Sequence, residues 1–187
     1  MISAQEVVNG LTGALRLAGR DTSGYGHFDT SLDGFWRSFT AALLALPAYI
    51  IVTALRTDSV GIDASAFFLV EAIAYVTGWF AFPFAMLYVT DMLDRRERYI
   101  TFIVATNWAT AIQLSVIGLI ASLEGIGLLP EGLAGFLSLV ATLWIISYQW
   151  FIARTALEIS GVTAAAVVLL DLTLGLVVAG VAGAIEG

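Results

Sequence analysis

Two acidic side chains lie deep inside apolar segments of this sequence. Glu71 occurs in the run "FFLVEAIAYV" and Asp171 in the run "VVLLDLTLGL". A carboxylate near the centre of a bilayer costs about 2.5–3.5 kcal/mol to insert, and neither run contains a basic residue that could neutralise it. Each carboxyl group must therefore be protonated, hydrogen-bonded by polar neighbours or exposed to a water-filled cavity. Two such groups close together could share a proton or bind a cation.

Polar side chains follow one face of another apolar segment, "VATNWATAIQ". Asn107, Thr110 and Gln113 recur every three residues, which places them along one side of a helix. Gln149 lies in the next apolar segment. With the two acids, these residues could form a hydrophilic pathway for an ion or a small solute. The other interpretation, which the sequence favours, is that they form hydrogen bonds between helices, worth about 0.6 kcal/mol each.

Small residues follow Asp171 at four-residue spacing. Gly175, Ala179 and Gly183 fall on the same helix face as the acid, and such a stripe lets another helix approach closely. We therefore expect Asp171 to face protein rather than lipid, either inside a bundle or at an interface with another chain. The stripe itself is predicted to be a helix-association face.

Two prolines lie inside apolar segments and are predicted to kink their helices. Pro83 cannot donate a hydrogen bond to the carbonyl of Trp79 and its ring clashes with that carbonyl; Pro47 is expected to act in the same way. A freed carbonyl within a membrane can serve an ion or a neighbouring hydroxyl, but most such prolines only shape the helix.

Several kinds of chemistry are excluded or unsupported. The chain has no Cys, which rules out disulfides and thiolate metal sites, and a single His, His27. No nucleophile elbow, phosphate loop or metalloprotease motif is present. A net charge of −7 argues against nucleic acid as a partner. We expect a protein that is not an enzyme and that uses no metal and no cofactor.

The elements that position these residues are transmembrane helices. The chain is 59% hydrophobic and only 12% charged, about half the charged share of soluble domains. Its apolar residues gather in runs of about 20, the length a helix needs to cross a bilayer. We predict an all-α polytopic membrane protein, with residues 35–187 forming one five-helix bundle. The predicted spans are 35–55, 64–92, 99–122, 132–153 and 161–184.

Residues 1–34 precede the first span and are predicted to form a helix followed by a polar linker. Ser3 and Glu6 have the spacing of a capping box at a helix start. The apolar residues that follow recur at helical spacing. Two interpretations stay open. The helix could lie on the membrane surface as an amphipathic helix, or it could pack on the loops of the same chain.

The arginines predict the orientation in the membrane. With the N-terminus in the cytoplasm, only Arg56 lies on the outer side. The cytoplasmic side then holds Arg16, Arg20, Arg37, Arg95, Arg96, Arg98 and Arg154. Because cytoplasmic loops carry an excess of basic residues, we predict a cytoplasmic N-terminus and an outer C-terminus. The short loops suggest a bacterial inner membrane.

Two stretches resemble the YIP family, the Ypt/Rab-interacting membrane proteins with five spans, in its bacterial branch. "SLDGFW" at 31–36 resembles the family's Asp-Leu-Tyr-Gly-Pro-Phe-Trp motif before the first span, without the Pro. "DRRERYITFIVATNWATAIQ" at 94–113 resembles the family's basic turn followed by Tyr and a polar break, although Asn107-Trp108 stands where Gly-Tyr is usual. The resemblance implies a non-enzymatic role in organising membrane proteins.

Two functions follow from these features. The first is a scaffold or accessory subunit that associates with another membrane protein, or with copies of itself, through helix–helix contacts in the lipid bilayer. The alternative is a small transporter or channel for an ion, a proton or another solute that uses Glu71 and Asp171. A membrane-embedded enzyme is the least favoured interpretation, because enzyme motifs are absent or weak in the sequence.

Overall fold

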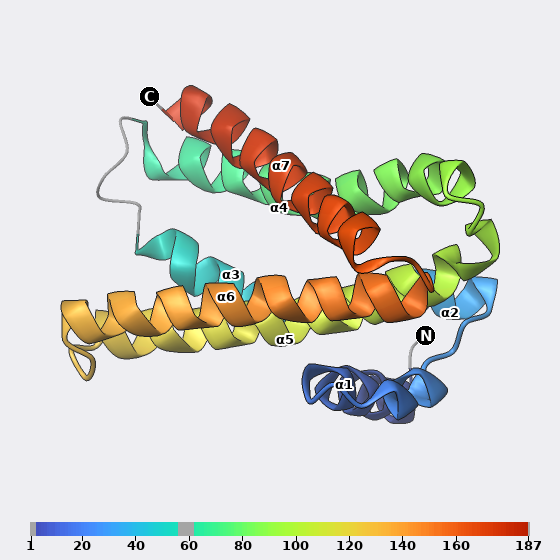
Figure 1. Ribbon diagram of the computed structural model, residues 1–187. Coiled ribbons are helices and arrows are strands. Elements are labelled where there is room, and N and C mark those ends of the chain that lie inside the picture. The colour runs from blue at the N-terminus through green and yellow to red at the C-terminus, as the bar shows by residue number, and fades with distance from the viewer. Residues whose placement is uncertain (1–2, 56–61, 187) are drawn as a thin grey trace.

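The computed structural model describes residues 3–55 and 62–186, and these residues are almost entirely helical with no β-strand (Figure 1). Arg56 lies outside the described residues. The helices, in chain order, are α1 (Ala4–Ala18), η1 (Thr22–His27), α2 (Leu32–Ser38), α3 (Ala41–Ala54), α4 (Ala64–Met92), η3 (Arg96–Arg98), α5 (Tyr99–Gly125), α6 (Glu131–Ala156) and α7 (Gly161–Glu186).

Five helical segments are long and apolar enough to cross a membrane: Leu32–Ala54, Ala64–Met92, Arg96–Gly125, Glu131–Ala156 and Gly161–Glu186. The prediction of an all-α polytopic membrane protein with five spans is therefore confirmed. Span boundaries agree with the sequence within a few residues, because the apolar runs set the helix lengths.

The first span differs from the prediction of one helix over 35–55, because it consists of α2 and α3 joined at Phe39 and Thr40. The backbone N–H groups of these two residues bond three residues back, to Trp36 and Arg37. The hydroxyl of Thr40 also donates to the carbonyl of Arg37, at 2.7 Å. Side-chain bonds of this kind compete with regular helical hydrogen bonds, which explains the break.

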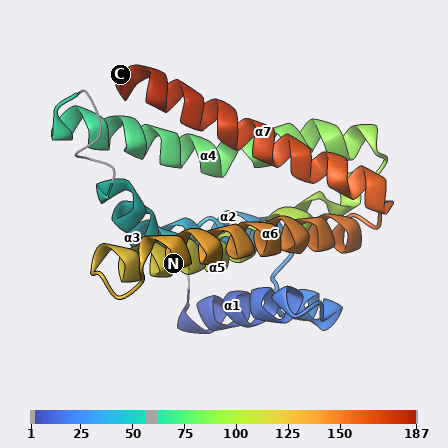
Figure 2. The ribbon, with the colours of Figure 1, turned by 60° about the vertical axis from the view of Figure 1, so that its left-hand side comes forward.

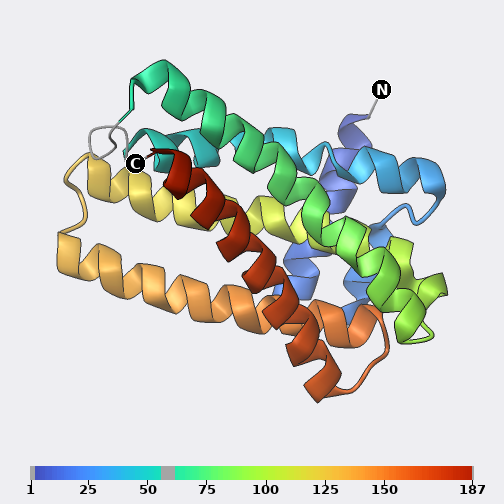
Figure 3. The same cartoon turned by 90° about the horizontal axis from the view of Figure 1, so that it is seen from above.

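The spans form two layers. Helices α3, α5 and α6 pack side by side in one layer, and α4 and α7 pack against each other in the second (Figures 1 and 3). The layers meet near η3 and the α6–α7 turn, and they separate towards the α5–α6 turn and the C-terminus (Figure 1). Following the predicted orientation, we call the end with η3 and the α6–α7 turn the inner end. We call the end with the α5–α6 turn and the C-terminus the outer end.

Small residues allow α3 and α5 to pack very closely. Ala41 and Ala45 are fully buried, and a Cβ atom built on Gly118 of α5 would lie only 2.5 Å from the Cβ of Ala48. No larger residue fits at Gly118 without moving α3. This close helix contact thus involves a glycine other than those of the α7 stripe.

Helix α1 packs on α5 and α6, on the face opposite α4 and α7 and near the inner end (Figure 2). The predicted capping box is present between Ser3 and Glu6. Leu17 is fully buried, whereas Val8 and Leu15 are 56% and 60% exposed. One face of α1 therefore packs on the chain itself, on the helices α5 and α6 as well as on η1 in the linker, and not on loops alone. The other face leaves apolar side chains uncovered.

Candidate functional site

A cavity of about 500 Å³ lies between the two layers of the bundle and is lined by all the long helices. The five polar residues singled out from the sequence all line it, namely Glu71 of α4, Asn107, Thr110 and Gln113 of α5, and Asp171 of α7. Gln149 of α6 also lines it. The structure thus brings together acids that are one hundred residues apart in the sequence.

Glu71 is held between α4 and α3. Its side chain is 6% exposed, and the hydroxyl of Tyr49 donates to its carboxylate. The ring of Tyr75 lies against that of Tyr49, with centroids 4.5 Å apart, and its hydroxyl donates to the carbonyl of Ala42 at 2.5 Å. The two tyrosines therefore join α3 to α4 around the acid.

Asp171 is bonded to α6. The Nε2 amide of Gln149 donates to Oδ2 of Asp171 at 2.9 Å, which satisfies one of the needs of a carboxyl group inside the membrane. Gln113 lies nearby and is 4% exposed. Its Nε2 and the Oε1 of Gln149 have no hydrogen-bond partner among the described residues. Buried polar atoms are normally paired, so these two atoms point to a ligand or a water molecule.

A small void lies on the inner side of Asp171, Gln113 and Gln149. It measures about 10 Å³, close to the space that one water molecule needs. Thr106 and apolar side chains, including Phe82 and Phe102, form the rest of its wall. The polar cluster therefore lines both the large cavity and this void.

The other polar residues of α5 divide between two roles. Asn107 is 4% exposed, and its Nδ2 donates to the hydroxyl of Ser38 at 2.8 Å. Thr110 donates to the carbonyl of Thr106 within its own helix, at 2.9 Å. Both interpretations of this stripe are therefore represented: Asn107 forms an interhelical bond, whereas Gln113 presents an unpaired amide at the cavity.

The two prolines differ in position. Pro83 lines the cavity, and its own carbonyl accepts a hydrogen bond from the hydroxyl of Tyr99 at 3.0 Å. Pro47 is exposed on α3. Both lie inside helices that continue through them, and the predicted kinks stay predictions.

The small-residue stripe of α7 packs against no other described helix. Gly175 and Ala179 line the cavity, and all three residues of the stripe are exposed. A Cβ atom built on Gly175 or on Gly183 would have no described atom within 4 Å, apart from neighbours in its own helix. Within this chain, the stripe widens the cavity instead of drawing two helices together.

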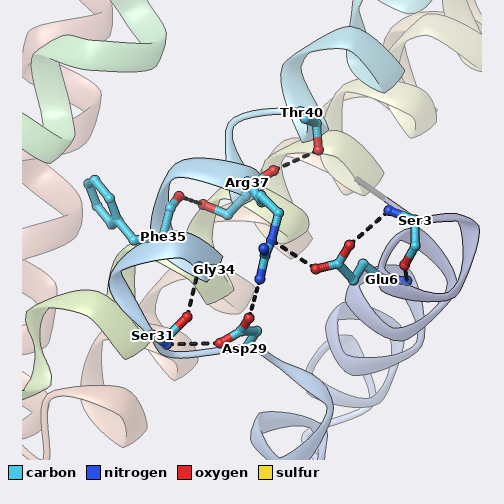
Figure 4. Close-up of polar contacts among 9 residues, drawn as sticks. Ser3, Glu6, Asp29, Ser31, Gly34, Phe35, Arg37 and Thr40 are labelled. Atoms are coloured by element: carbon cyan, nitrogen blue, oxygen red, sulfur yellow. Dashed lines mark hydrogen bonds and ion pairs between the residues drawn. The ribbon is translucent and has the colours of Figure 1, made fainter. Parts of the chain in front are cut away.

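A second cavity, of about 60 Å³, lies at the inner end beneath α1. Arg37 lines it, with Nε 2.8 Å from Oε1 of Glu6 and Nη2 2.5 Å from Oδ2 of Asp29 (Figure 4). The backbone N–H of Ser3, together with Arg37, lowers the pKa of Glu6. Hydrogen bonds from Ser31, together with Arg37, lower the pKa of Asp29. Both acids are therefore ionised partners of Arg37 at neutral pH.

The hydrogen bond between Asn107 and Ser38 lies between the two cavities. Asn107 lines the large one and Ser38 lines the small one.

Further bonds hold α1 and η1 over the inner end. The hydroxyl of Tyr148 donates to the carbonyl of Ala14 at 2.5 Å, and Arg20 donates to the carbonyl of Ser147 at 2.6 Å.

Two partners in the site were not found from the sequence. Tyr49 was overlooked, although a tyrosine inside an apolar span needs a partner for its hydroxyl and this need is a usable signal. Ser38 was assigned to no role because it falls at the break between α2 and α3. Its partner lies 69 residues away, and no local pattern indicates such a contact.

The described ionisable side chains that line the large cavity with a possible charge at neutral pH are acidic. Among the described residues, its lining contains Glu71 and Asp171 and no Arg or His. Within residues 3–55 and 62–186, no group of three His, Cys, Asp or Glu side chains could hold a metal ion. The chemistry available is hydrogen bonding, negative charge and a wall rich in aromatic rings.

Comparison with known proteins gives no match, whether with family models, curated proteins or solved structures. The resemblance to the YIP family stays a prediction, and the function has to be argued from the geometry alone.

Proposed function

We propose that this membrane protein binds a small solute or ion in the large cavity and works as a small transporter or channel. One observation carries the proposal: Glu71, Asp171 and Gln113, whose buried Nε2 has no partner among the described residues, line a single cavity between the helix layers. Intramembrane acids that line cavities are typical of ion and solute pathways. In the predicted orientation, the cavity lies on the side where the layers separate towards the outer end.

The size of the cavity suits a small occupant. Its volume is about 500 Å³, which falls within the 300–1,000 Å³ of typical ligand pockets.

The inner end supplies a closure for such a pathway. The bond between Asn107 and Ser38 separates the large cavity from the smaller one beneath α1. The ion pairs of Arg37 with Glu6 and Asp29 fasten α2 to α1 and to the linker at that point. Passage of a solute to the cytoplasm would require these contacts to loosen.

Thiol accessibility tests whether the cavity holds water. Because the chain has no Cys, a single Thr110→Cys variant in liposomes reports on the cavity without background. We expect a cationic methanethiosulfonate reagent added in water to modify it. Thr142→Cys, on the exposed surface of α6, is the matched control that faces lipid and should stay unmodified. An unreactive Thr110→Cys would refute a water-filled pathway.

Flux measurements test the role of the acids. We expect proteoliposomes to pass protons or potassium ions above the rate of protein-free liposomes, and Asp171→Asn to reduce that flux. Glu124→Asn, at an exposed acid near the end of α5, is the control and should leave the flux unchanged. If Thr110→Cys is reactive but the flux equals that of protein-free liposomes, transport is rejected and only solute binding in the cavity is left.

The exposed stripe on α7 supports a second candidate, the scaffold that associates with another membrane protein or a second copy. Gly175 lines the cavity and Gly183 does not. If α7 is an association face, Gly175→Leu and Gly183→Leu should both weaken assembly, measured by cross-linking in membranes. If the cavity is a solute site, only Gly175→Leu should reduce flux, because only that side chain would occupy the cavity.

A further inference from the structure

We propose that the large cavity binds an uncharged solute with a free hydroxyl group, such as a small polyol, and that Gln113 and Gln149 recognise this hydroxyl. The inference rests on the proposed function and names the chemical class of the solute. It is carried by one buried donor and one buried acceptor that have no partners among the described residues. The size of the void that both amides line decides which group they bind.

Gln113 of α5 supplies the donor. Its side chain is 4% exposed, and its Nε2 has no hydrogen-bond partner among the described residues. A buried donor that loses water without gaining an acceptor is costly. The group that binds beside Gln113 must therefore present an acceptor to it.

Gln149 of α6 supplies the acceptor. Its Nε2 donates to Oδ2 of Asp171 at 2.9 Å, so the nitrogen end of the amide faces the acid. Its Oε1 is buried and has no donor among the described residues. The group that binds here must therefore also donate a hydrogen bond.

The donor and the acceptor together select for a neutral group. A hydroxyl accepts a hydrogen bond through its oxygen and donates one through its proton. An ammonium group only donates and a carboxylate only accepts. The ammonium group would leave the donor of Gln113 unsatisfied, and the carboxylate would leave the acceptor of Gln149 unsatisfied.

The void beside the two amides limits the size of this group. Gln113, Gln149 and Asp171 line the void together, and it measures about 10 Å³, close to the space that one water molecule needs. A primary amide also donates and accepts, but its carbon, oxygen and nitrogen atoms need more space. A hydroxyl oxygen has the size that the void accepts.

The rest of the solute lies in the large cavity. The residues that line the void also line this cavity of about 500 Å³, so a solute held by its hydroxyl extends into it. The wall there combines the polar Thr110 with apolar side chains such as Leu114 and Ile117. Such a mixture of apolar surface and a few placed polar groups is typical of small-molecule sites, and it suits the C–H and O–H groups of a polyol.

Protection of a thiol tests the proposal. Thr110 lies three residues before Gln113 on α5, so the two are neighbours on one helix face and both line the cavity. We expect erythritol to slow the modification of Thr110→Cys in proteoliposomes by the cationic methanethiosulfonate reagent, with a saturable dependence on erythritol concentration. Rates are measured relative to a free thiol in the same solution.

Fully O-methylated erythritol is the matched control compound. Its ether oxygens accept hydrogen bonds but do not donate them, so it should not protect the thiol. Equal protection by the two compounds would overturn the inference, because no hydroxyl would then be needed. Protection by tetramethylammonium chloride and not by erythritol would overturn it in favour of a cation.

Variants locate the bound hydroxyl. In the Thr110→Cys background, Gln113→Leu removes the donor and should raise the erythritol concentration for half-protection by about fivefold or more. Gln113→Glu keeps the shape of the side chain but replaces the donor by an acceptor. It should have the same effect, which decides the question if Gln113→Leu alters the packing. Glu124→Gln, at the exposed end of α5, is the matched control and should leave protection unchanged. Full protection in both Gln113 variants would contradict the proposed location.

The outcome is separable from that of the proposed function. A reactive Thr110→Cys that erythritol does not protect would reject the hydroxyl-bearing solute and leave the water-filled pathway in place. An unreactive Thr110→Cys would reject the pathway, and the inference with it.

Discussion

Replacement of Gly10 by alanine should lift α1 from the inner end of the bundle. A Cβ atom built on Gly10 would lie 2.2 Å from Cε2 and 2.4 Å from Cδ2 of the Trp108 ring. Trp108 belongs to the core of α5 and is only 4% exposed, so its ring has little room to move. The added methyl group must therefore push α1 away.

The expected size of the effect follows from what holds α1 in place. Overpacking of this kind costs about 1–3 kcal/mol, which corresponds to an undocked population roughly five to 150 times larger. Full burial of Leu17 contributes about 1.5–3 kcal/mol to docking. The hydrogen bond from Tyr148 to the carbonyl of Ala14 adds about 1 kcal/mol. Gly10→Ala should thus remove a large fraction of the docking free energy.

A buried thiol can report the undocking of α1. Val104 is 1% exposed and lines the small cavity with Gly10 and Trp108. Val104→Cys supplies a reporter that is shielded while α1 is docked, since a free Cys packs as a small hydrophobic residue. In that background, Gly10→Ala should speed modification by a water-soluble disulfide reagent. Gly26→Ala, whose added methyl meets no atom within 4 Å, is the control. Equal rates in the two variants would refute this packing of α1.

Three further outcomes are expected. Gly118→Ala should lower the free energy of unfolding by about 1–3 kcal/mol, because its methyl group would lie 2.5 Å from the Cβ of Ala48. Gly135→Ala is the control and should not lower it, because the space around Gly135 is open. Unfolding in mixed micelles measures both variants. Asp171→Leu should lower the free energy of unfolding by about 1 kcal/mol, because the amide of Gln149 loses its hydrogen-bond acceptor. Asp171→Asn keeps an acceptor oxygen and should lower it less. The same unfolding assay measures both variants. The pKa of Glu6 lies below its ordinary 4.5, so its contribution to docking is complete above that pH and is lost as the pH falls through the lowered value. Because disulfide reagents attack the thiolate, labelling of Val104→Cys is measured relative to a free thiol at the same pH. This ratio should stay constant between about pH 7 and 5 and rise only as the pH falls to the lowered pKa of Glu6.

Helix positions were predictable because hydropathy determines them. The segment 64–92 expected from its apolar run is the helix Ala64–Met92, and the last span begins at Gly161 as expected. The break within the first span was not predictable in the same way. It depends on the hydroxyl groups of Ser38 and Thr40, which donate hydrogen bonds to nearby backbone carbonyls. Serine and threonine do not form such bonds in every helix, so their presence does not predict a break.

The content of the site was predictable, but its assembly was not. Spacing along a helix shows which side chains share a face, and it identified Asn107, Thr110 and Gln113 correctly as one stripe. It does not show which helix the stripe meets. Whether Glu71 and Asp171 face the same space depends on how the α4–α7 layer lies over α5, which is set by packing between residues far apart in the sequence. The small residues after Asp171 illustrate the same limit, because Gly175 lies beside a cavity and not beside a helix.

The energetics of Asp171 favour a role beyond holding helices together. An aspartate near the centre of a membrane costs about 2.5–3.5 kcal/mol on insertion scales. A hydrogen bond between membrane helices returns on average about 0.6 and at most about 1.7 kcal/mol. Asp171 accepts one such bond, from the amide of Gln149. That bond leaves roughly 1–3 kcal/mol of the insertion cost uncompensated. This remainder supports the proposal that Asp171 meets a polar occupant of the cavity.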